Sequence, residues 1–207
     1  LSIPYNSAIN TETFTVAIWY YVTSWESHQH ITSSQYITGS SRNGYEIYQN
    51  STNQQFAFGL ENGTGVNQND ITTPNNLSLN TWYHIAITYD GTTQKLYHNG
   101  SLYSQQSFSN YSPNTTNNTF IGYSTISQNA FNGYMYDYRY FNRAITSNET
   151  SLIYSEHKII SDEVLHIPMS DVSNNTDIRT NIGSYRITES TITNSGNVTT
   201  KVWPGNY

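Results

Sequence analysis

Aromatic and polar side chains suited to sugar recognition gather between residues 24 and 50. Exposed aromatic rings stack on the faces of sugars, while Asn, Gln and Ser side chains hydrogen-bond the hydroxyl groups around them. Trp25, Tyr45 and Tyr48 lie near the polar loops 26–30 and 40–43, so we select them as candidate carbohydrate-binding residues. The competing interpretation is that these rings pack in a core, as most of the 19 tyrosines must.

Catalytic residues do not stand out in the sequence. Hydrolysis of a glycoside needs two carboxylates that flank one cleft, typically acidic residues at alternate positions of a strand. The nearest acidic pair, Asp162 and Glu163, is adjacent in sequence, so its side chains point to opposite sides of an extended chain. We therefore assign no catalytic residue and predict that the chain is not an enzyme.

Metal-ligand spacing is incomplete in this sequence. His28 and His30 could place two imidazoles on one strand face, but no third ligand accompanies them. Four aspartates occupy loop-like positions of the kind that hold calcium, without the ligand spacing of a calcium loop: Asp70, Asp90, Asp171 and Asp177. We predict no cofactor and no metal site, and calcium cannot be assigned to any residue.

The stretch 81–103 has the pattern of an antiparallel meander. Its first strand alternates between two faces, with Tyr83, Ile85, Ile87 and Tyr89 on the predicted core side. Asp90-Gly91 and Asn99-Gly100 are hairpin signals, because type I′ turns need positive φ at both central residues. This stretch places the chain in the β class.

Further strands are predicted on both sides of the meander. FTVAIWYYV at 14–22 is apolar on both faces, which indicates a central strand covered on both sides. Shorter strands are expected at 36–38, 45–48, 55–60, 120–123 and 134–141. Thr146 and Glu149 have the spacing of a capping box, which predicts a short helix over 147–154.

The end of this region carries a specific motif, with Asn132-Gly133, Asp137, Arg139 and Asn142-Arg143-Ala144 in that order. It resembles the closing motif of the laminin-G-like, concanavalin A-like jelly-roll family. Trp82-Tyr83-His84 and Tyr97-x-Asn99-Gly100 resemble the family's middle motif, and FTVAIWYYV resembles its early strand. The resemblance implies an all-β, antiparallel β-sandwich with one short helix near 147–154, in which these motif residues are mostly structural.

The ends of the chain depart from the family pattern. Family domains usually have a further strand before the Leu-x-Ile-Pro stretch, whereas this chain starts there, and VLHIPM at 164–169 resembles the missing opening strand. We therefore divide the chain into a laminin-G-like sandwich at 1–155 and a C-terminal segment at 156–207. That segment completes the same sandwich as a circular permutation, which we favour, or a neighbour's sandwich, or it begins another module.

Composition limits the partners. The net charge of −6 with only 8 Lys and Arg leaves no basic stripe, so we expect no nucleic-acid partner. No apolar run is long enough to span a bilayer, so we expect no membrane insertion. The chain contains no cysteine, so it must hold together without disulfides.

Asparagine sequons suggest exposure to a glycosylating environment. Asn-x-Ser/Thr occurs ten times, at Asn50, Asn62, Asn76, Asn99, Asn110, Asn114, Asn117, Asn148, Asn174 and Asn197. The first residue is Leu1, which fits a protein whose leader was removed or a piece of a longer product. We expect an extracellular, cell-surface or virion-surface location.

Together these observations predict a non-enzymatic binding or adhesion module that recognises a glycan or a cell-surface protein. The first alternative is a structural subunit of a virion, spike or filament that self-assembles by exchanging its C-terminal strand. The second, less favoured alternative is a glycoside hydrolase.

Overall fold

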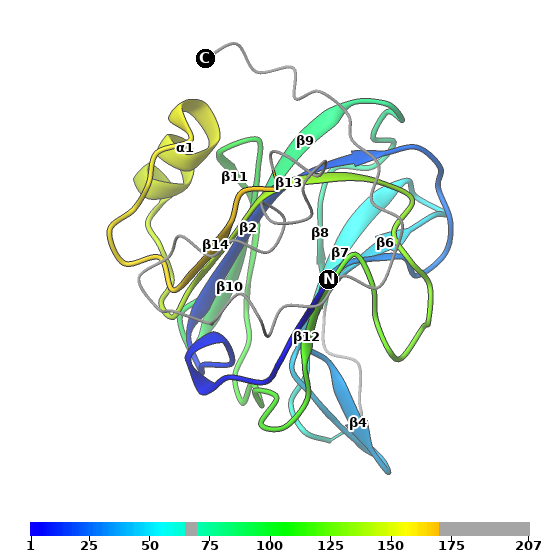
Figure 1. Cartoon of the computed structure of the whole chain (residues 1–207), viewed down its shortest axis with the longest axis vertical. Helices are drawn as coiled ribbons and strands as arrows, with labels where there is room; N and C mark the ends of the chain where they lie inside the picture. The colour runs from blue at the N-terminus through cyan, green and yellow to red at the C-terminus, as the bar shows by residue number, and fades with distance from the viewer. Residues whose placement is uncertain (65–69, 170–207) are drawn as a thin grey trace.

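The computed structural model describes residues 1–64 and 70–169, which form two sheets lying face to face (Figure 1). The sheet that we call the β6 sheet contains, in spatial order, β1 (Ser2–Ile3), β12 (Thr119–Ile121), β3 (His30–Ser33), β6 (Tyr45–Asn50), β7 (Gln55–Leu60) and β8 (Ile71–Thr72). The sheet that we call the β2 sheet contains β11 (Ser101–Ser107), β10 (Thr93–His98), β9 (Trp82–Tyr89), β2 (Phe14–Val22), β13 (Gly133–Phe141) and β14 (Leu165–Ile167).

Every strand pairing in these sheets is antiparallel, so the predicted β-sandwich is confirmed. A short ribbon of β4 (Tyr36–Thr38) and β5 (Ser41–Asn43) projects from one end, and a 3-10 turn covers Ser7–Ile9. No helix of the described residues is long and apolar enough to cross a membrane.

Strand β2 is buried along its whole length, as its two apolar faces predict. Phe14, Val16 and Ile18 enter the core that the two sheets share. On the opposite face, Trp19 stacks on Tyr154 of the helix, with ring centroids 5.2 Å apart. One side of β2 therefore faces the core, and Trp19 on the other side packs against the helix.

The meander 81–103 forms as predicted, with one difference in its turns. At Asn99-Gly100 both φ angles are positive, 49° and 77°, as a type I′ turn requires. At the other turn only Gly91 has positive φ, and the Asp90 carboxylate accepts hydrogen bonds from the backbone N–H groups of Thr92 and Thr93. The type I′ prediction is wrong there, because the Asp90 side chain stabilises a longer loop.

Helix α1 (Ser147–Glu156) begins at the predicted capping box. The Thr146 hydroxyl accepts from the Glu149 backbone N–H, and the Glu149 carboxylate accepts from the Thr146 backbone N–H. The helix ends at Glu156, and the capping residue His157 adopts the left-handed conformation at φ 49°. It is two residues longer than predicted.

Strand β14 lies at the edge of the β2 sheet, paired with β13 of the same chain. Leu165 faces Tyr140 and Ile167 faces Tyr138 in this register, and both aliphatic side chains enter the shared core. The segment that resembles the family's opening strand thus lies within this chain's own sandwich. Residues 170–207 fall outside the described part, so a circular permutation of the whole segment stays a prediction.

Candidate functional site

The outer side of the β6 sheet carries a cluster of carboxylates and aromatic rings. Strand β6 alternates, so Tyr45 and Ile47 enter the core while Glu46 and Tyr48 point away from it. Strand β7 alternates in the same way, which places Gly59 on the outer side. We call this surface the acidic face and define it by Glu46, Tyr48, Gly59, Glu61 and Asp70, with Gln35 and His30 beside them.

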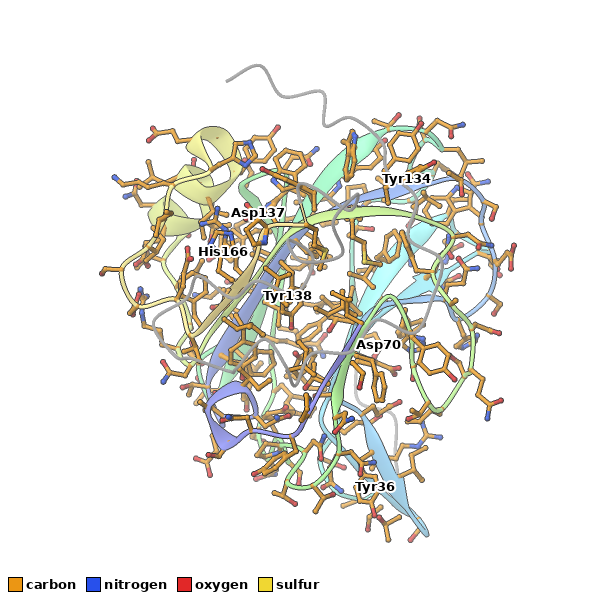
Figure 2. All side chains as sticks on the ribbon, viewed as in Figure 1. Tyr36, Asp70, Tyr134, Asp137, Tyr138 and His166 are labelled. Atoms are coloured by element: carbon orange, nitrogen blue, oxygen red, sulfur yellow. The ribbon has the colours of Figure 1, made fainter. Side chains whose placement is uncertain are left out.

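Asp70, which is labelled in Figure 2, is exposed and Tyr48 is half-buried, so together they form the solvent-facing part of the acidic face. The Tyr48 hydroxyl donates to Asp70 Oδ2 at 2.5 Å. A Cβ atom on Gly59 would lie 3.0 Å from Asp70 Oδ1, so the glycine makes room for the carboxylate. Partial loss of hydration raises the pKa of Asp70; the Tyr48 hydrogen bond opposes this shift, and the charge of Glu46 adds to it.

Tyr48 also stacks on a histidine. The rings of His28 and Tyr48 are parallel within 1°, with their centroids 5.5 Å apart. His28 is exposed and Tyr48 is half-buried. Partial burial raises the pKa of Tyr48, and its hydrogen bond to Asp70 adds to the shift, so the hydroxyl stays a donor. The two rings together form an aromatic wall beside Asp70.

The inner part of the acidic face is held by Gln35 and His30. The Gln35 amide donates to Glu46 Oε1 at 3.2 Å and also to Glu61 Oε1. His30 Nε2 lies 2.8 Å from Glu46 Oε2. Glu61 is only 3% exposed, and this burial raises its pKa, with the charge of Glu46 adding to the shift. These groups form a hydrogen-bonded acidic floor beneath the aromatic wall.

The three predicted sugar-binding residues fall in different environments. Tyr48 lies on the acidic face, whereas Trp25 packs half-buried against Phe56 at the margin of the core, with centroids 5.8 Å apart. Tyr45 is 0% exposed and stacks on Phe14 at 4.8 Å. The prediction for Tyr45 is therefore wrong, because the alternation that turns Tyr48 outward turns Tyr45 into the core. A role for Trp25 stays a prediction.

Sequence analysis missed the carboxylates of this site, which come from separate elements. Glu46 could have been found, because the alternation of YEIYQN places it on the same side as Tyr48. Glu61 follows β7 and Asp70 precedes β8, so they meet only when these two strands pair with their neighbours.

The histidines and aspartates considered as metal ligands have other roles. His28 stacks on Tyr48, His30 bonds Glu46, and Asp90 closes the turn after β9. Within residues 1–64 and 70–169, no three His, Asp or Glu side chains are grouped so that they could hold a metal ion. Asp171 and Asp177 lie outside the described residues.

The sequons differ in accessibility. Asn76, Asn110 and Asn148 are exposed, whereas Asn50, Asn62, Asn99 and Asn117 are half-buried. Asn114 is 0% exposed and its Nδ2 donates to the Asn117 carbonyl oxygen at 2.7 Å. A glycan on that nitrogen would break this bond and has no room in the folded chain, so Asn114 is removed from the predicted sites. Asn174 and Asn197 lie outside the described residues.

Solved structures with this fold include several binding domains. A Bacteroides ovatus protein described as carbohydrate-binding aligns with a TM-score of 0.60 and 20% identity, over 83% of this chain and 49% of that one. The Ruminococcus gnavus IT-sialidase CBM40 domain bound to α2,3-sialyllactose has a TM-score of 0.59 and 14% identity, over 74% of this chain and 92% of that one. The heptameric SAP-like pentraxin from Limulus polyphemus has a TM-score of 0.54 and 17% identity, over 74% and 72%.

These identities are low, so the alignments establish a shared fold alone. This chain matches only about half the length of the Bacteroides protein. No curated protein matches its sequence. The family model described as the concanavalin A-like lectin/glucanases superfamily matches residues 1–151, which is most of the chain. The sandwich, its closing motif and this match agree, and the chain belongs to the concanavalin A-like lectin/glucanases superfamily.

Proposed function

We propose that this chain is a non-enzymatic glycan-binding module that works at a cell or virion surface, with the acidic face as its sugar site. The observation that carries the proposal is the His28–Tyr48 ring pair beside the Asp70 carboxylate. Proteins commonly hold a sugar by an aromatic ring against its apolar face and by polar groups on its hydroxyls. The carbohydrate-binding neighbours with the same fold support this assignment.

A glycan array with the purified chain tests this proposal. We expect wild-type binding to at least one glycan and about tenfold weaker binding by Tyr48→Ala, since loss of an aromatic contact costs about 1.5 kcal/mol. Tyr48→Phe keeps the ring but loses the bond to Asp70, so its binding should fall between the two. Tyr103→Ala is the matched control, because Tyr103 is 54% exposed on β11 of the other sheet.

Two results would contradict this proposal. An array on which the folded wild-type chain binds no glycan would argue against a glycan-binding function. Binding that survives Tyr48→Ala but is lost in Tyr103→Ala would move the site to the other sheet. Circular dichroism of each variant shows whether the fold is retained.

Glycoside hydrolysis is the second candidate, favoured by carboxyl groups with raised pKa beside another carboxylate, as a general acid requires. Against it, the Tyr48 hydroxyl bonds Asp70, and the Gln35 amide bonds both glutamates. A reducing-sugar assay on a panel of polysaccharides decides between the two functions. We expect no product, and product that disappears in Glu61→Gln would establish a hydrolase.

A further inference from the structure

Glu61 has an unmet hydrogen-bond acceptor at the floor of the acidic face. Its Oε1 accepts from the Gln35 amide and lies 4.0 Å from Arg42 Nη1. Its Oε2 is buried and has no hydrogen-bond partner in the described part of the chain. Leaving a buried carboxylate oxygen without a donor is unfavourable, so the site lacks a donor at this position.

The hydrogen-bond donors of the acidic face are already bonded to groups of this chain. The Tyr48 hydroxyl donates to Asp70 at 2.5 Å, and the Gln35 amide serves the two glutamates. The two ring nitrogens of His30 lie 2.8 Å from Glu46 Oε2 and 3.1 Å from Ser127 Oγ. A ligand that satisfies Glu61 Oε2 must therefore bring donors of its own, and sugar hydroxyl groups are such donors.

The negative charge of the acidic face also favours an uncharged ligand. Glu46, Glu61 and Asp70 place three carboxylates on one surface, and Arg42 Nη1 lies 4.0 Å from the Glu61 carboxylate. An anionic ligand would meet like charges there, which disfavours its binding. Proteins usually bind a ligand carboxylate through the paired hydrogen-bond donors of an arginine. Glu46, Glu61 and Asp70 offer hydrogen-bond acceptors instead of such donors.

We propose that the acidic face selects uncharged glycans and rejects sialylated ones, an inference that rests on the glycan-binding function proposed above. Hydroxyl groups of the sugar donate to Glu61 Oε2 and to the Asp70 carboxylate, while an apolar sugar face lies against the His28–Tyr48 wall. The Ruminococcus gnavus domain was solved with sialyllactose bound, so this fold can accept a sialylated ligand. In this chain, the carboxylates of the acidic face repel a sialylated ligand.

Matched pairs of immobilised oligosaccharides test the selection, each pair differing only by a terminal sialic acid. For pairs whose uncharged member binds, we expect the sialylated member to bind at least about tenfold more weakly. Comparable or tighter binding of the sialylated members would overturn the inference while leaving the glycan-binding function standing. No binding to either member would instead count against that function.

Two conservative variants separate the two carboxylates. Glu61→Gln keeps the shape of the side chain but replaces the negative charge, so binding to the uncharged glycan should weaken about tenfold. Asp70→Asn should reduce the discrimination between the two members of each pair, because it removes the more exposed negative charge. Glu156→Gln is the control, since it changes the net charge equally at the exposed end of α1.

The control variant Glu156→Gln must leave unchanged both the affinity for the uncharged glycan and the discrimination against its sialylated partner. Glu61→Gln that binds the uncharged glycan as wild type does would remove Glu61 from the site. Asp70→Asn that keeps full discrimination would show that charge on this face does not select the ligand. Unfolding curves for each variant exclude a loss of folding as the cause.

Discussion

At the scale of single residues, His84 is a buried imidazole in a mostly aromatic environment. It is 0% exposed, and its ring centroid lies 5.2 Å from Trp19 and 5.9 Å from Tyr154. Neither ring nitrogen has a hydrogen-bond partner among the described residues. Burial lowers the pKa of His84 to about 3, although the charge of Asp137 opposes the shift. The ring is therefore neutral in the folded protein at neutral pH.

His84 should make the protein sensitive to acid. In the unfolded chain His84 takes up a proton near its ordinary pKa of 6.5, so the unfolded state binds more protons as the pH falls from there toward 3. Between pH 7 and pH 4, wild type should lose up to about 3 kcal/mol more unfolding free energy than His84→Phe. Urea unfolding at the two pH values measures this difference.

The control for this prediction is His28→Gln, because His28 is exposed. Its loss of stability between the two pH values should match that of wild type. If His84→Phe also loses as much as wild type, the buried imidazole is not the source of the acid sensitivity.

At the scale of elements, a buried ionic network joins β13, β14 and the segment after α1. Arg139 is 1% exposed; its guanidinium donates to Asp137 at 3.0 and 2.8 Å and to Glu163 at 2.7 Å. His166 of β14 lies 2.6 Å from Asp137 Oδ1 and 2.8 Å from Glu163 Oε2. Figure 2 shows Asp137 and His166 side by side, away from Asp70. Asp137 and Arg139, two residues of the closing motif, therefore form an ion pair within β13.

The pKa values of Asp137 and His166, two groups of this network, shift in opposite directions. Burial would raise the pKa of Asp137, but hydrogen bonds from His157 and His166 and the charge of Arg139 hold it well below its usual range. Burial would lower the pKa of His166, but its bonds to Asp137 and Glu163 raise it. The stability from His166 is thus present below pH 6.5 and is lost as the pH rises through its folded pKa, whereas that from Asp137 is present above pH 3.8.

Removal of Arg139 should destabilise the fold far more than removal of a similar surface arginine. Arg139→Met leaves Asp137 and Glu163 buried without their counter-charge, which costs about 3–5 kcal/mol. Arg143→Met is the matched control: its side chain is 35% exposed and pairs with Glu149 and Asp162, so its loss should cost about 1 kcal/mol or less. Denaturant unfolding at pH 7 compares them, and equal costs would contradict this account of the network.

At the scale of the whole molecule, both sheets share the main core of the described residues, and two smaller apolar clusters lie apart from it. Strand β14 supplies Leu165 and Ile167 to that core from the edge of the β2 sheet, within the same chain. A strand that is already paired in its own sandwich is less available to pair with a strand of a neighbouring molecule. This observation disfavours a structural subunit that exchanges this part of its C-terminal segment.

We therefore expect the chain to fold as a stable monomer. At micromolar concentration, sedimentation should give the mass of one chain, and unfolding should be a single cooperative transition whose midpoint does not depend on protein concentration. A midpoint that rises with concentration, together with a dimer or larger assembly, would favour the strand-exchange alternative.

Local patterns in the sequence were enough to predict most of the fold. Phe14–Val22 is apolar on both faces and is buried on both, because a strand's alternation is a property of neighbouring residues. The Thr146–Glu149 capping box and the Asn99-Gly100 turn also form as predicted, since each involves contacts within four residues. The closing motif led to the family, which the match over residues 1–151 established.

The tertiary structure decided the site. The sequence offered Tyr45 and Tyr48 as equals, and only the pairing of β6 between β3 and β7 fixed which of them faces solvent. Glu61 and Asp70 stand at the two ends of the connection between β7 and β8, and Asp70 reaches Gly59 and Glu46 because β7 pairs with β8 on one side and with β6 on the other. Strand alternation is set by adjacent residues and can be read from the sequence, whereas the register between distant strands is set by long-range backbone pairing, which appears only when the chain is folded.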